Sequence, residues 1–340
     1  MRALTLIADR ELKVTDRPPP PAPAADEVQI RVKALGLNHI DVWGWRGMAF
    51  AKRKLPLVIG AEAAGEITAV GSGVTTLAEG TRVVMYGAPT CGACPACREG
   101  RDNLCENPAG VMGFHLDGFA RDLLNMPARL VIPIPDGVSF VDAACAPIAF
   151  STVTHMLFDN AKLQPGETIL VHAGGSGIGT AAILMAKAIG CTVITTVGDA
   201  TKIDKARALG ADHVINYRDE RFEHVVRKLT AKRGVDVVFE HVGGETFNRS
   251  LLALKRGGRL VTCGATSGPT TTLNLMQLFQ QQYRIFGSFG ASMRNIRDSL
   301  ATMAGGLRPV IDCELPLCEF ETGLARLEQR QVFGKIVLRF

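Results

Sequence analysis

Long hydrophobic runs and blocks of like charge are both missing from this 340-residue sequence, which also has only three tyrosines and two tryptophans. No apolar run of 18 residues lacks a charge or a glycine, so we expect no transmembrane helix and no membrane partner. Lys and Arg (38) are interspersed with Asp and Glu (33), for a net charge of +5. A nucleic-acid-binding protein needs a basic patch or stripe, so we expect no such partner. Met1 leads into an alternating segment without a signal-peptide core, which favours a cytoplasmic protein.

The hydrophobic pattern of the sequence differs between its first 140 residues and the part that begins near residue 165. Residues 1 to about 140 contain short alternating segments separated by glycine and proline, a pattern typical of an all-β, barrel-like domain. From about residue 165, apolar strands alternate with helices, which predicts a doubly wound parallel sheet. The expected strands there are 168–173, 192–197, 213–217, 235–240, 259–263 and 284–288. The expected helices between them are 178–189, 203–209, 222–230 and 246–254.

Four of the nine cysteines crowd into residues 91–105, which read CGACPACREGRDNLC. The spacing C-x2-C-x2-C-x7-C is typical of a closed tetrahedral zinc site, and the x2 turns let neighbouring sulfurs converge. Without an export signal, metal binding is favoured over disulfides. We therefore expect one Zn²⁺ on Cys91, Cys94, Cys97 and Cys105. Because four thiolates leave no open position for water or substrate, the predicted role is structural.

A glycine-rich turn, HAGGSGIG at residues 172–179, lies between an expected strand and an expected helix. In this context glycines allow a dinucleotide pyrophosphate to approach the backbone, and the helix N-terminus favours its charge. The G-x-G-x-x-G pattern falls on Gly174, Ser176 and Gly179, with a serine in the second place. We assign cofactor binding to these residues and to their neighbours Gly177 and Ile178. The alternative is a tight turn without a ligand.

Cofactor choice is decided at the end of the second strand of the parallel sheet. NAD-binding chains place an Asp or Glu there for the ribose hydroxyl. Here the strand ends at Val197, and Lys202 follows, which favours NADP(H) over NAD(H). Two observations keep NAD(H) open: Asp199 lies 20 residues after Gly179, and Lys202 also fits an ordinary exposed position at a helix start.

Several segments together resemble the medium-chain dehydrogenase/reductase superfamily over essentially the whole chain. They are 38-NHID-41, 60-GAEAAG-65, 80-GTRVV-84, the cysteine cluster, 172-HAGGSGIG-179, 209-LGADHVINY-217, 257-GGRLVTCGATSG-268 and 333-FGKIVL-338. The resemblance implies a GroES-like β-barrel catalytic domain (1–140) with a zinc lobe, a Rossmann domain (141–288) and a return to the catalytic domain (289–340), with catalysis in the cleft between the domains. It also implies a homodimer or homotetramer, and it places Tyr217 and Val242 at the cofactor.

Zinc alcohol dehydrogenases of this superfamily hold a catalytic zinc on Cys, His and Cys. The matching positions here are Asn38, Ala61 and residues 147–150, none of which is a cysteine or histidine. The resemblance therefore implies that the catalytic zinc is lost. Asn38 with Asp41 is instead similar to the quinone oxidoreductase branch, although that branch usually lacks the four cysteines.

The predicted function is NADPH-dependent reduction of an enone, activated alkene or quinone, a small-molecule carbonyl substrate, without a catalytic metal. In this hypothesis Asn38 donates a hydrogen bond to the substrate oxygen, His39 or water supplies a proton, and Asp41 orients its neighbours. Simpler roles remain open: Asn38 satisfying backbone groups, His39 lining the pyrophosphate, and Glu62 as a buried structural carboxylate. Two other functions remain open as well. One is an alcohol dehydrogenase with zinc on His39, Asp41 and Glu62, and the other is a crystallin-like cofactor-binding protein of low activity.

Overall fold

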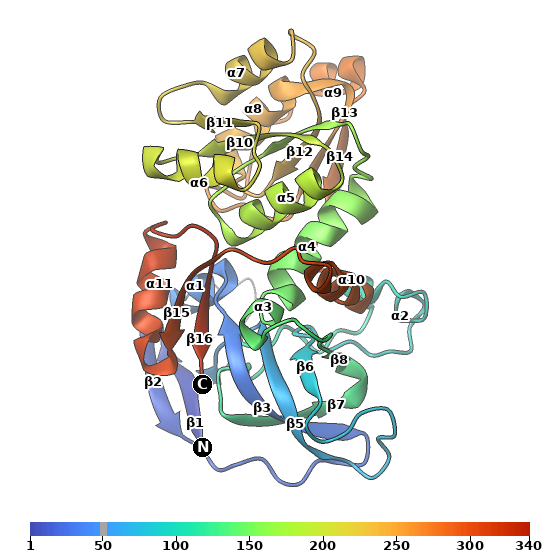
Figure 1. Cartoon of the computed structure of the whole chain (residues 1–340), viewed down its shortest axis with the longest axis vertical. Helices are drawn as coiled ribbons and strands as arrows, with labels where there is room; N and C mark the ends of the chain where they lie inside the picture. Colours follow the sequence, from blue (N-terminus) through green and yellow to red (C-terminus); the bar gives the residue numbers. More distant parts are fainter. Residues whose placement is uncertain (48–52) are drawn as a thin grey trace. The chain divides into compact units, whose positions relative to one another are not determined.

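The chain forms two compact units in a computed structural model that describes residues 1–47 and 53–340. Unit 1 comprises Met1–Ser151 with Ala291–Phe340, and unit 2 comprises Thr152–Gly290 (Figure 1). The expected boundary after residue 140 lies eleven residues before this one. Residues 141–151 belong to unit 1, where the backbone amides of Ile148 and Ala149 bind the carboxylate of Glu62.

Unit 1 is built mainly on antiparallel strands, as the alternating segments predict, and only β15 and β16 pair parallel among its described strands. Among the described residues, one sheet has the order β15-β16-β3-β5-β6-β8, with β7 paired to β3, and a second has the order β2-β1-β4. The C-terminal strand β16 pairs antiparallel with β3. Their bounds are β1 (Arg2–Ala8), β2 (Glu11–Asp16), β3 (Glu27–Gly36), β4 (Leu57–Val58), β5 (Ala63–Val70), β6 (Arg82–Met85), β7 (Leu123–Pro127), β8 (Val131–Pro133), β15 (Ile311–Pro316) and β16 (Lys335–Arg339).

Short helices connect these strands. They are α1 (His39–Trp45), α2 (Pro95–Arg98), η1 (Asp102–Leu104), η2 (Ala128–Leu130), α3 (Phe140–Ala143), η3 (Ala146–Phe150), α10 (Met293–Ala304), η6 (Leu317–Glu319) and α11 (Phe320–Glu328). The helical stretch Phe140–Asn160 is long and apolar enough to span a membrane, but 72% of its apolar window is buried inside the protein. That burial is the property of a core helix.

Unit 2 confirms the predicted Rossmann fold. Its six parallel strands, all within the fully described range 152–290, have the order β11-β10-β9-β12-β13-β14. The strands are β9 (Thr168–Val171), β10 (Thr192–Val197), β11 (His213–Asn216), β12 (Val235–Glu240), β13 (Leu254–Thr262) and β14 (Arg284–Gly287). The helical segments are α4 (Ser151–Thr154), η4 (His155–Asn160), α5 (Gly177–Ala188), η5 (Ala200–Lys202), α6 (Ile203–Ala208), α7 (Phe222–Leu229), α8 (Gly244–Ala253) and α9 (Leu275–Gln281).

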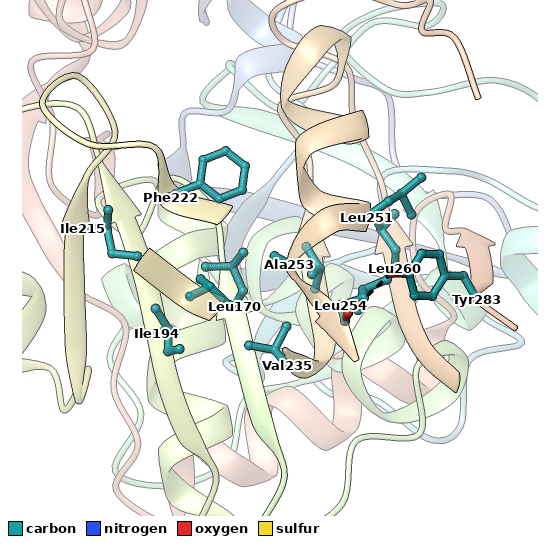
Figure 2. Packing of buried hydrophobic residues seen from close by; sticks show 12 residues of the cluster. Leu170, Ile194, Ile215, Phe222, Val235, Leu251, Ala253, Leu254, Leu260 and Tyr283 are labelled. Carbon is teal, nitrogen blue, oxygen red and sulfur yellow. Dashed lines mark hydrogen bonds between the residues drawn. The ribbon is translucent and has the colours of Figure 1, made fainter. Parts of the chain in front are cut away.

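A compact apolar cluster joins the unit 2 sheet to its covering helices. Leu170 and Ile194 of the sheet face Phe222 of α7 and Leu251 of α8, all at most 2% exposed (Figure 2). Burial on both faces explains why the strands read as continuous apolar runs. The cluster holds the sheet and its helices together, and the predicted cofactor residues lie at the ends of these strands.

Candidate functional site

The glycine-rich turn connects β9 to α5, where the sequence places it. A Cβ added to Gly174 would lie 2.2 Å from Thr195 Oγ1, and one added to Gly179 would lie 2.2 Å from the carbonyl oxygen of Ala173. No side chain fits at either position. The turn therefore brings bare backbone to the carboxyl edge of the parallel sheet, where dinucleotide phosphates bind in this fold.

Ser176, in the second place of the glycine pattern, caps helix α5. Its hydroxyl accepts a hydrogen bond from the Gly179 amide at 3.0 Å. Gly177 and Ile178 form the first residues of the helix and are only half-buried. The helix start is thus ordered by its own cap and partly open to solvent, which suits an anion.

His172 braces the turn from inside, a role that the sequence did not reveal. Its Nδ1 lies 3.1 Å from Thr196 Oγ1, and its Nε2 lies 2.8 Å from Ser250 Oγ. Ser250 donates to the Thr246 carbonyl, so it accepts from Nε2–H. Burial lowers the pKa of His172 to about 3 and keeps the ring neutral. A neutral ring can accept at Nδ1 and donate at Nε2, as these contacts require.

Glu240 holds the loop after β12 in a similar way. Its Oε1 accepts from the amides of Val242 at 2.7 Å and Gly243 at 2.8 Å, and Thr262 donates to its Oε2 at 3.1 Å. Burial raises the pKa of this carboxyl, and these hydrogen bonds oppose the shift. Val242, a predicted cofactor residue, is thereby fixed at the same sheet edge as the glycine turn.

The residues that bear on cofactor choice gather at the ends of β10 and β11. Val197 is 2% exposed and apolar. Asp199 caps η5, since its Oδ1 accepts from the Thr201 amide at 2.9 Å and from the Thr201 hydroxyl at 2.8 Å. These bonds lower the pKa of Asp199, assisted by the charges of Lys202 and Arg218. Two cations therefore lie within electrostatic range of this strand end, and Arg218 was not predicted.

Tyr217 also lies at this edge. A Cβ added to Gly198 would meet its hydroxyl oxygen at 2.3 Å, and the side chain is 40% exposed. The structure thus brings all the predicted cofactor residues of unit 2 to the carboxyl ends of β9, β10, β11 and β12.

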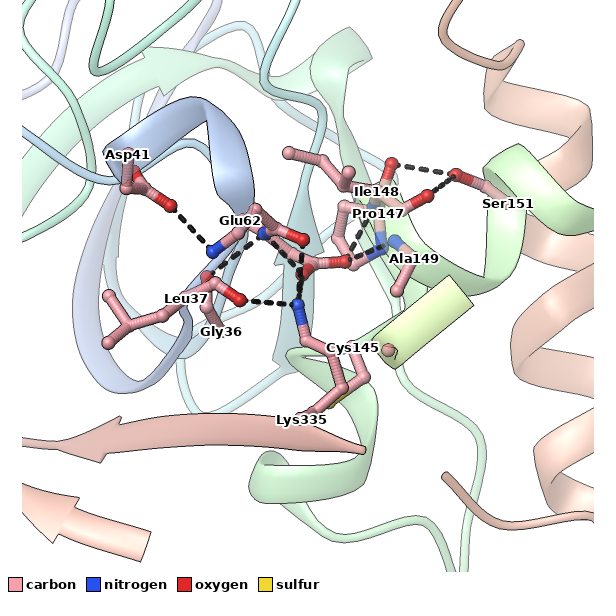
Figure 3. Close-up of polar contacts among 12 residues, drawn as sticks. Gly36, Leu37, Asp41, Glu62, Cys145, Pro147, Ile148, Ala149, Ser151 and Lys335 are labelled. Atoms are coloured by element: carbon pink, nitrogen blue, oxygen red, sulfur yellow. Dashed lines mark hydrogen bonds and ion pairs between the residues drawn. The ribbon is translucent and has the colours of Figure 1, made fainter. Parts of the chain in front are cut away.

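A buried ion pair between Glu62 and Lys335 lies beside the candidate catalytic residues Asn38 and Asp41 (Figure 3). Lys335 Nζ lies 2.8 Å from Glu62 Oε2, and the two side chains are 3% and 0% exposed. Nζ also donates to the Leu37 carbonyl at 2.9 Å and to Asn38 Oδ1 at 2.8 Å. All three ammonium hydrogens thus have acceptors. No role is assigned from the sequence to Lys335, which lies in the segment FGKIVL.

Glu62 has a partner on every side. Its Oε1 accepts from the amides of Ile148 at 2.6 Å and Ala149 at 2.8 Å, where Pro147 interrupts the regular hydrogen bonding of the helix. Its Oε2 accepts from Lys335 and, at 2.8 Å, from Asn38 Nδ2. This carboxylate is therefore fully hydrogen-bonded within the protein.

Asn38 is held by the same network. Its Nδ2 donates to the Gly36 carbonyl at 3.1 Å as well as to Glu62. Both amide hydrogens are thus already donated, so Asn38 could bind a substrate oxygen only by giving one of them up. Its backbone amide donates to Asp41 Oδ2 at 2.8 Å. This arrangement corresponds to the simpler of the roles considered for Asn38.

Asp41 and His39 differ in their surroundings. Asp41 is 3% exposed, and burial raises its pKa to about 6 against its hydrogen bonds to the amides of Asn38 and Gly60. His39 is half-buried, with its ring 6.4 Å from that of Trp43 in an edge contact. Burial, aided by nearby cationic side chains, lowers the pKa of His39, so the ring is neutral near pH 7. Among the described residues, no hydrogen bond to this ring is seen.

The four cysteines of the lobe meet, as predicted. Their sulfur atoms all lie within 4.8 Å of one another, with Cys91 3.6 Å from Cys105 and 4.0 Å from Cys97. A tetrahedral zinc with Zn–S bonds of about 2.3 Å separates its sulfurs by about 3.8 Å, so the cluster fits this ion. Amides of Ala93 and Cys94 lower the pKa of Cys91 to about 6. Of the described residues, His39, Asp41 and Glu62 do not form a comparable group.

Comparisons with known proteins agree with this architecture. Residues 24–136 match the alcohol dehydrogenase GroES-like domain, and residues 177–305 match the zinc-binding dehydrogenase family. The chain is 32% identical to an acryloyl-coenzyme A reductase of Metallosphaera sedula, over 94% of this chain and 93% of the relative. It is 34% identical to a quinone oxidoreductase of Salmonella typhimurium, over 83% and 76%.

Solved structures show the same fold over the whole chain. A structure described as an NAD-dependent alcohol dehydrogenase superimposes with a TM-score of 0.94 at 40% identity, covering 100% of both chains. With both domain families matched, the chain is an NAD(P)-dependent oxidoreductase and belongs to the medium-chain dehydrogenase/reductase superfamily.

Proposed function

We propose that this enzyme reduces activated alkenes, enones or quinones with NADPH and uses no catalytic metal. The observation that carries the proposal is the saturated network around Glu62. At the positions where related enzymes bind a catalytic zinc, this chain has an amide (Asn38), a methyl group (Ala61) and a helix whose amides bind Glu62. No thiolate or imidazole is offered there.

The chemistry follows from what such a site can stabilise. Oxidation of a simple alcohol requires loss of the hydroxyl proton, which zinc promotes by lowering the pKa of a bound oxygen. Reduction of a conjugated carbonyl is less demanding. The bound cofactor supplies a hydride to the β-carbon, charge collects on the oxygen, and the α-carbon takes a proton from solvent. Hydrogen-bond donors at the oxygen are sufficient aid.

Within this proposal His39 replaces Asn38 as the main donor to the substrate oxygen. Its ring is neutral near pH 7 and has an N–H that no described residue accepts, whereas both Asn38 hydrogens are used. Replacing one such donor typically costs about 10²–10³ in rate when the site excludes water. His39 is half-buried, so His39→Ala should lower kcat roughly tenfold with little change in KM. His213→Ala, an exposed histidine of β11, is the control and should leave kcat unchanged.

The similarity to a quinone oxidoreductase and to an acryloyl-coenzyme A reductase supports this reaction class. The similarity to the structure of an NAD-dependent alcohol dehydrogenase supports the second candidate, an alcohol dehydrogenase with unusual zinc ligands. One experiment separates the two. The purified enzyme is assayed with NADPH against a quinone, an enone and an enoyl thioester, and with NADP⁺ against primary and secondary alcohols, while bound zinc is counted by mass spectrometry. One zinc per chain with turnover of conjugated substrates supports the proposal. Two zinc ions with chelator-sensitive alcohol oxidation would establish the alternative.

We also propose that NADP(H) is preferred over NAD(H). The supporting observations are the apolar strand end at Val197, the engagement of Asp199 in capping η5, and the nearby cations Lys202 and Arg218. A charge-assisted contact contributes about 1.5–3 kcal/mol. Lys202→Ala should therefore raise the NADPH dissociation constant roughly 10- to 100-fold and leave NADH binding nearly unchanged. Lys228→Ala removes an equal charge from α7 and should have no effect. Tighter wild-type binding of NADH would instead assign Asp199 to the ribose.

We further propose that the enzyme self-associates as a dimer or tetramer. Helix α9 exposes Leu275 (65%), Met276 (60%) and Phe279 (64%), and clustered exposed apolar residues often mark protein contacts. Light scattering after size exclusion should give a mass of at least two chains. Phe279→Asp should shift it toward one chain if α9 forms the contact.

A further inference from the structure

One carboxylate of the metal-binding lobe serves a helix that lies far away in the sequence. Asp102 begins η1, between the third and fourth cysteines, and its Oδ2 accepts from the amide of Met293 at 3.0 Å. Met293 is the first residue of α10, 191 positions later. Close by, the hydroxyl of buried Tyr86 donates to the carbonyl of Ala291 at 3.0 Å. The start of α10, where the chain re-enters unit 1, is thus bound by side chains beside the cysteine cluster. Figure 1 shows the backbone position of α10 in unit 1.

The position of Asp102 depends on the cysteines around it. The Asp102 carbonyl accepts from the amide of Cys105 at 3.0 Å, so the last metal ligand is hydrogen-bonded to the turn that Asp102 begins. Apolar packing contributes little to this loop, because Leu104 is 53% exposed. A metal that joins Cys97 to Cys105 closes the loop and sets the place of Asp102.

Helix α10 in turn packs against segment η3, which contacts the candidate site. Its buried residues include Ile296, Leu300 and Met303, and the helix contacts α3, β8 and η3. Segment η3 provides the two amides that bind Glu62. Contacts within unit 1 therefore run without interruption from the cysteine cluster through Asp102 and α10 to the Asn38–Glu62–Lys335 network.

We propose that Asp102 is a positioning residue that couples metal binding in the lobe to α10, and through α10 to the candidate active site. The lobe then does more than stabilise itself, because occupancy by zinc holds the helix that supports η3. The link to α10 is independent of the reaction catalysed. The relevance to catalysis rests on the proposed function.

Hydrogen exchange of the zinc-loaded, full-length enzyme tests the first link without any turnover. Asp102→Ala removes the acceptor of the Met293 amide, and a capping contact of this kind is worth about 1–2 kcal/mol. Amides in residues 291–300 should therefore exchange about 5- to 30-fold faster in the variant at saturating zinc. Glu99→Ala is the matched control, since Glu99 is an exposed acid of the same lobe that pairs with Arg101. It should leave α10 unchanged.

Removal of zinc by a chelator should reproduce the effect in the wild type and extend it to residues 146–150. By linkage, Asp102→Ala should also bind zinc several-fold more weakly at equilibrium, in competition with a colorimetric chelator. If chelation unfolds unit 1 as a whole, the variant at saturating zinc decides the question alone. Unchanged exchange in 291–300 for Asp102→Ala would overturn the proposal. Faster exchange without turnover of any conjugated substrate would retain the coupling and reject only the proposed function.

Discussion

Substitution of Lys335 by Met is expected to destabilise unit 1 more than any surface charge replacement. Glu62 is 0% exposed, and the change would leave its carboxylate without a counter-ion. Breaking a buried pair by removing one partner costs about 3–5 kcal/mol. Three donors to Glu62 remain, from Asn38, Ile148 and Ala149, so we expect the lower end, about 3 kcal/mol.

A double-mutant cycle makes this expectation quantitative. Glu62→Gln should cost a similar amount. Both carboxylate oxygens of Glu62 accept hydrogen bonds, whereas Gln has only one accepting oxygen, so donors on the other side would lose their acceptor. The double variant Glu62→Gln/Lys335→Met removes both charges, so its cost should approach that of one single change. The resulting coupling energy is about 2–3 kcal/mol, within the range for residues in one network.

The assay uses the two tryptophans of the chain, Trp43 and Trp45, which both lie in α1 beside Asn38. Their fluorescence in urea follows unfolding of unit 1. Arg2→Met is the control, since the Arg2–Asp122 pair has nearly the same separation, 2.9 Å, but 55% and 23% exposure. It should cost at most about 1 kcal/mol. The reasoning would be refuted if the losses of unfolding free energy in the two single variants simply added in the double variant. It would also be refuted if each single variant lost no more than Arg2→Met.

Three further predictions concern other parts of the chain. Cys94→Ser should release zinc and lower the thermal midpoint, because structural zinc contributes to folding; full zinc occupancy by metal analysis would contradict this. The depressed pKa of His172, about 3 when folded against about 6.5 when unfolded, means that unit 2 loses stability as pH falls from 6.5 toward 3. At pH 5 the free energy of unfolding should be about 2 kcal/mol lower than at neutral pH, and urea titrations of His172→Asn should not show this decrease. Gly179→Ala forces a methyl group against the Ala173 carbonyl, so it should cost about 1–3 kcal/mol and weaken cofactor binding by calorimetry.

Local signals in the sequence predicted most of the fold and the cluster of four cysteines. The continuous apolar run of residues 168–173 and the glycines that follow specify a strand and a turn within a dozen residues. The cysteines needed only their own spacing. These features depend on neighbours in the chain, so a single sequence displays them.

The network around Glu62 could not be predicted in the same way. Glu62 and Lys335 lie 273 positions apart, and neither local sequence indicates which residue the other charge belongs to. One signal was present, namely that each is a charged residue at the start of an apolar segment, AEAAG and GKIVL. Two such residues of opposite sign in one domain suggest a buried pair, since an isolated buried charge is too costly.

The contribution of Asp41 to stability should depend on pH in the direction opposite to that of His172. Its folded pKa of about 6 exceeds the ordinary value of 3.8, so the folded state binds the proton more tightly. The stability from this group is therefore complete below pH 3.8 and is lost as pH rises through 6. Two units correspond to about 3 kcal/mol. The difference in unfolding free energy between wild type and Asp41→Asn should fall by roughly that amount from pH 4 to pH 7, measured by tryptophan fluorescence in urea. A constant difference would mean that Asp41 is ionised throughout and that its hydrogen bonds to the amides of Asn38 and Gly60 outweigh burial.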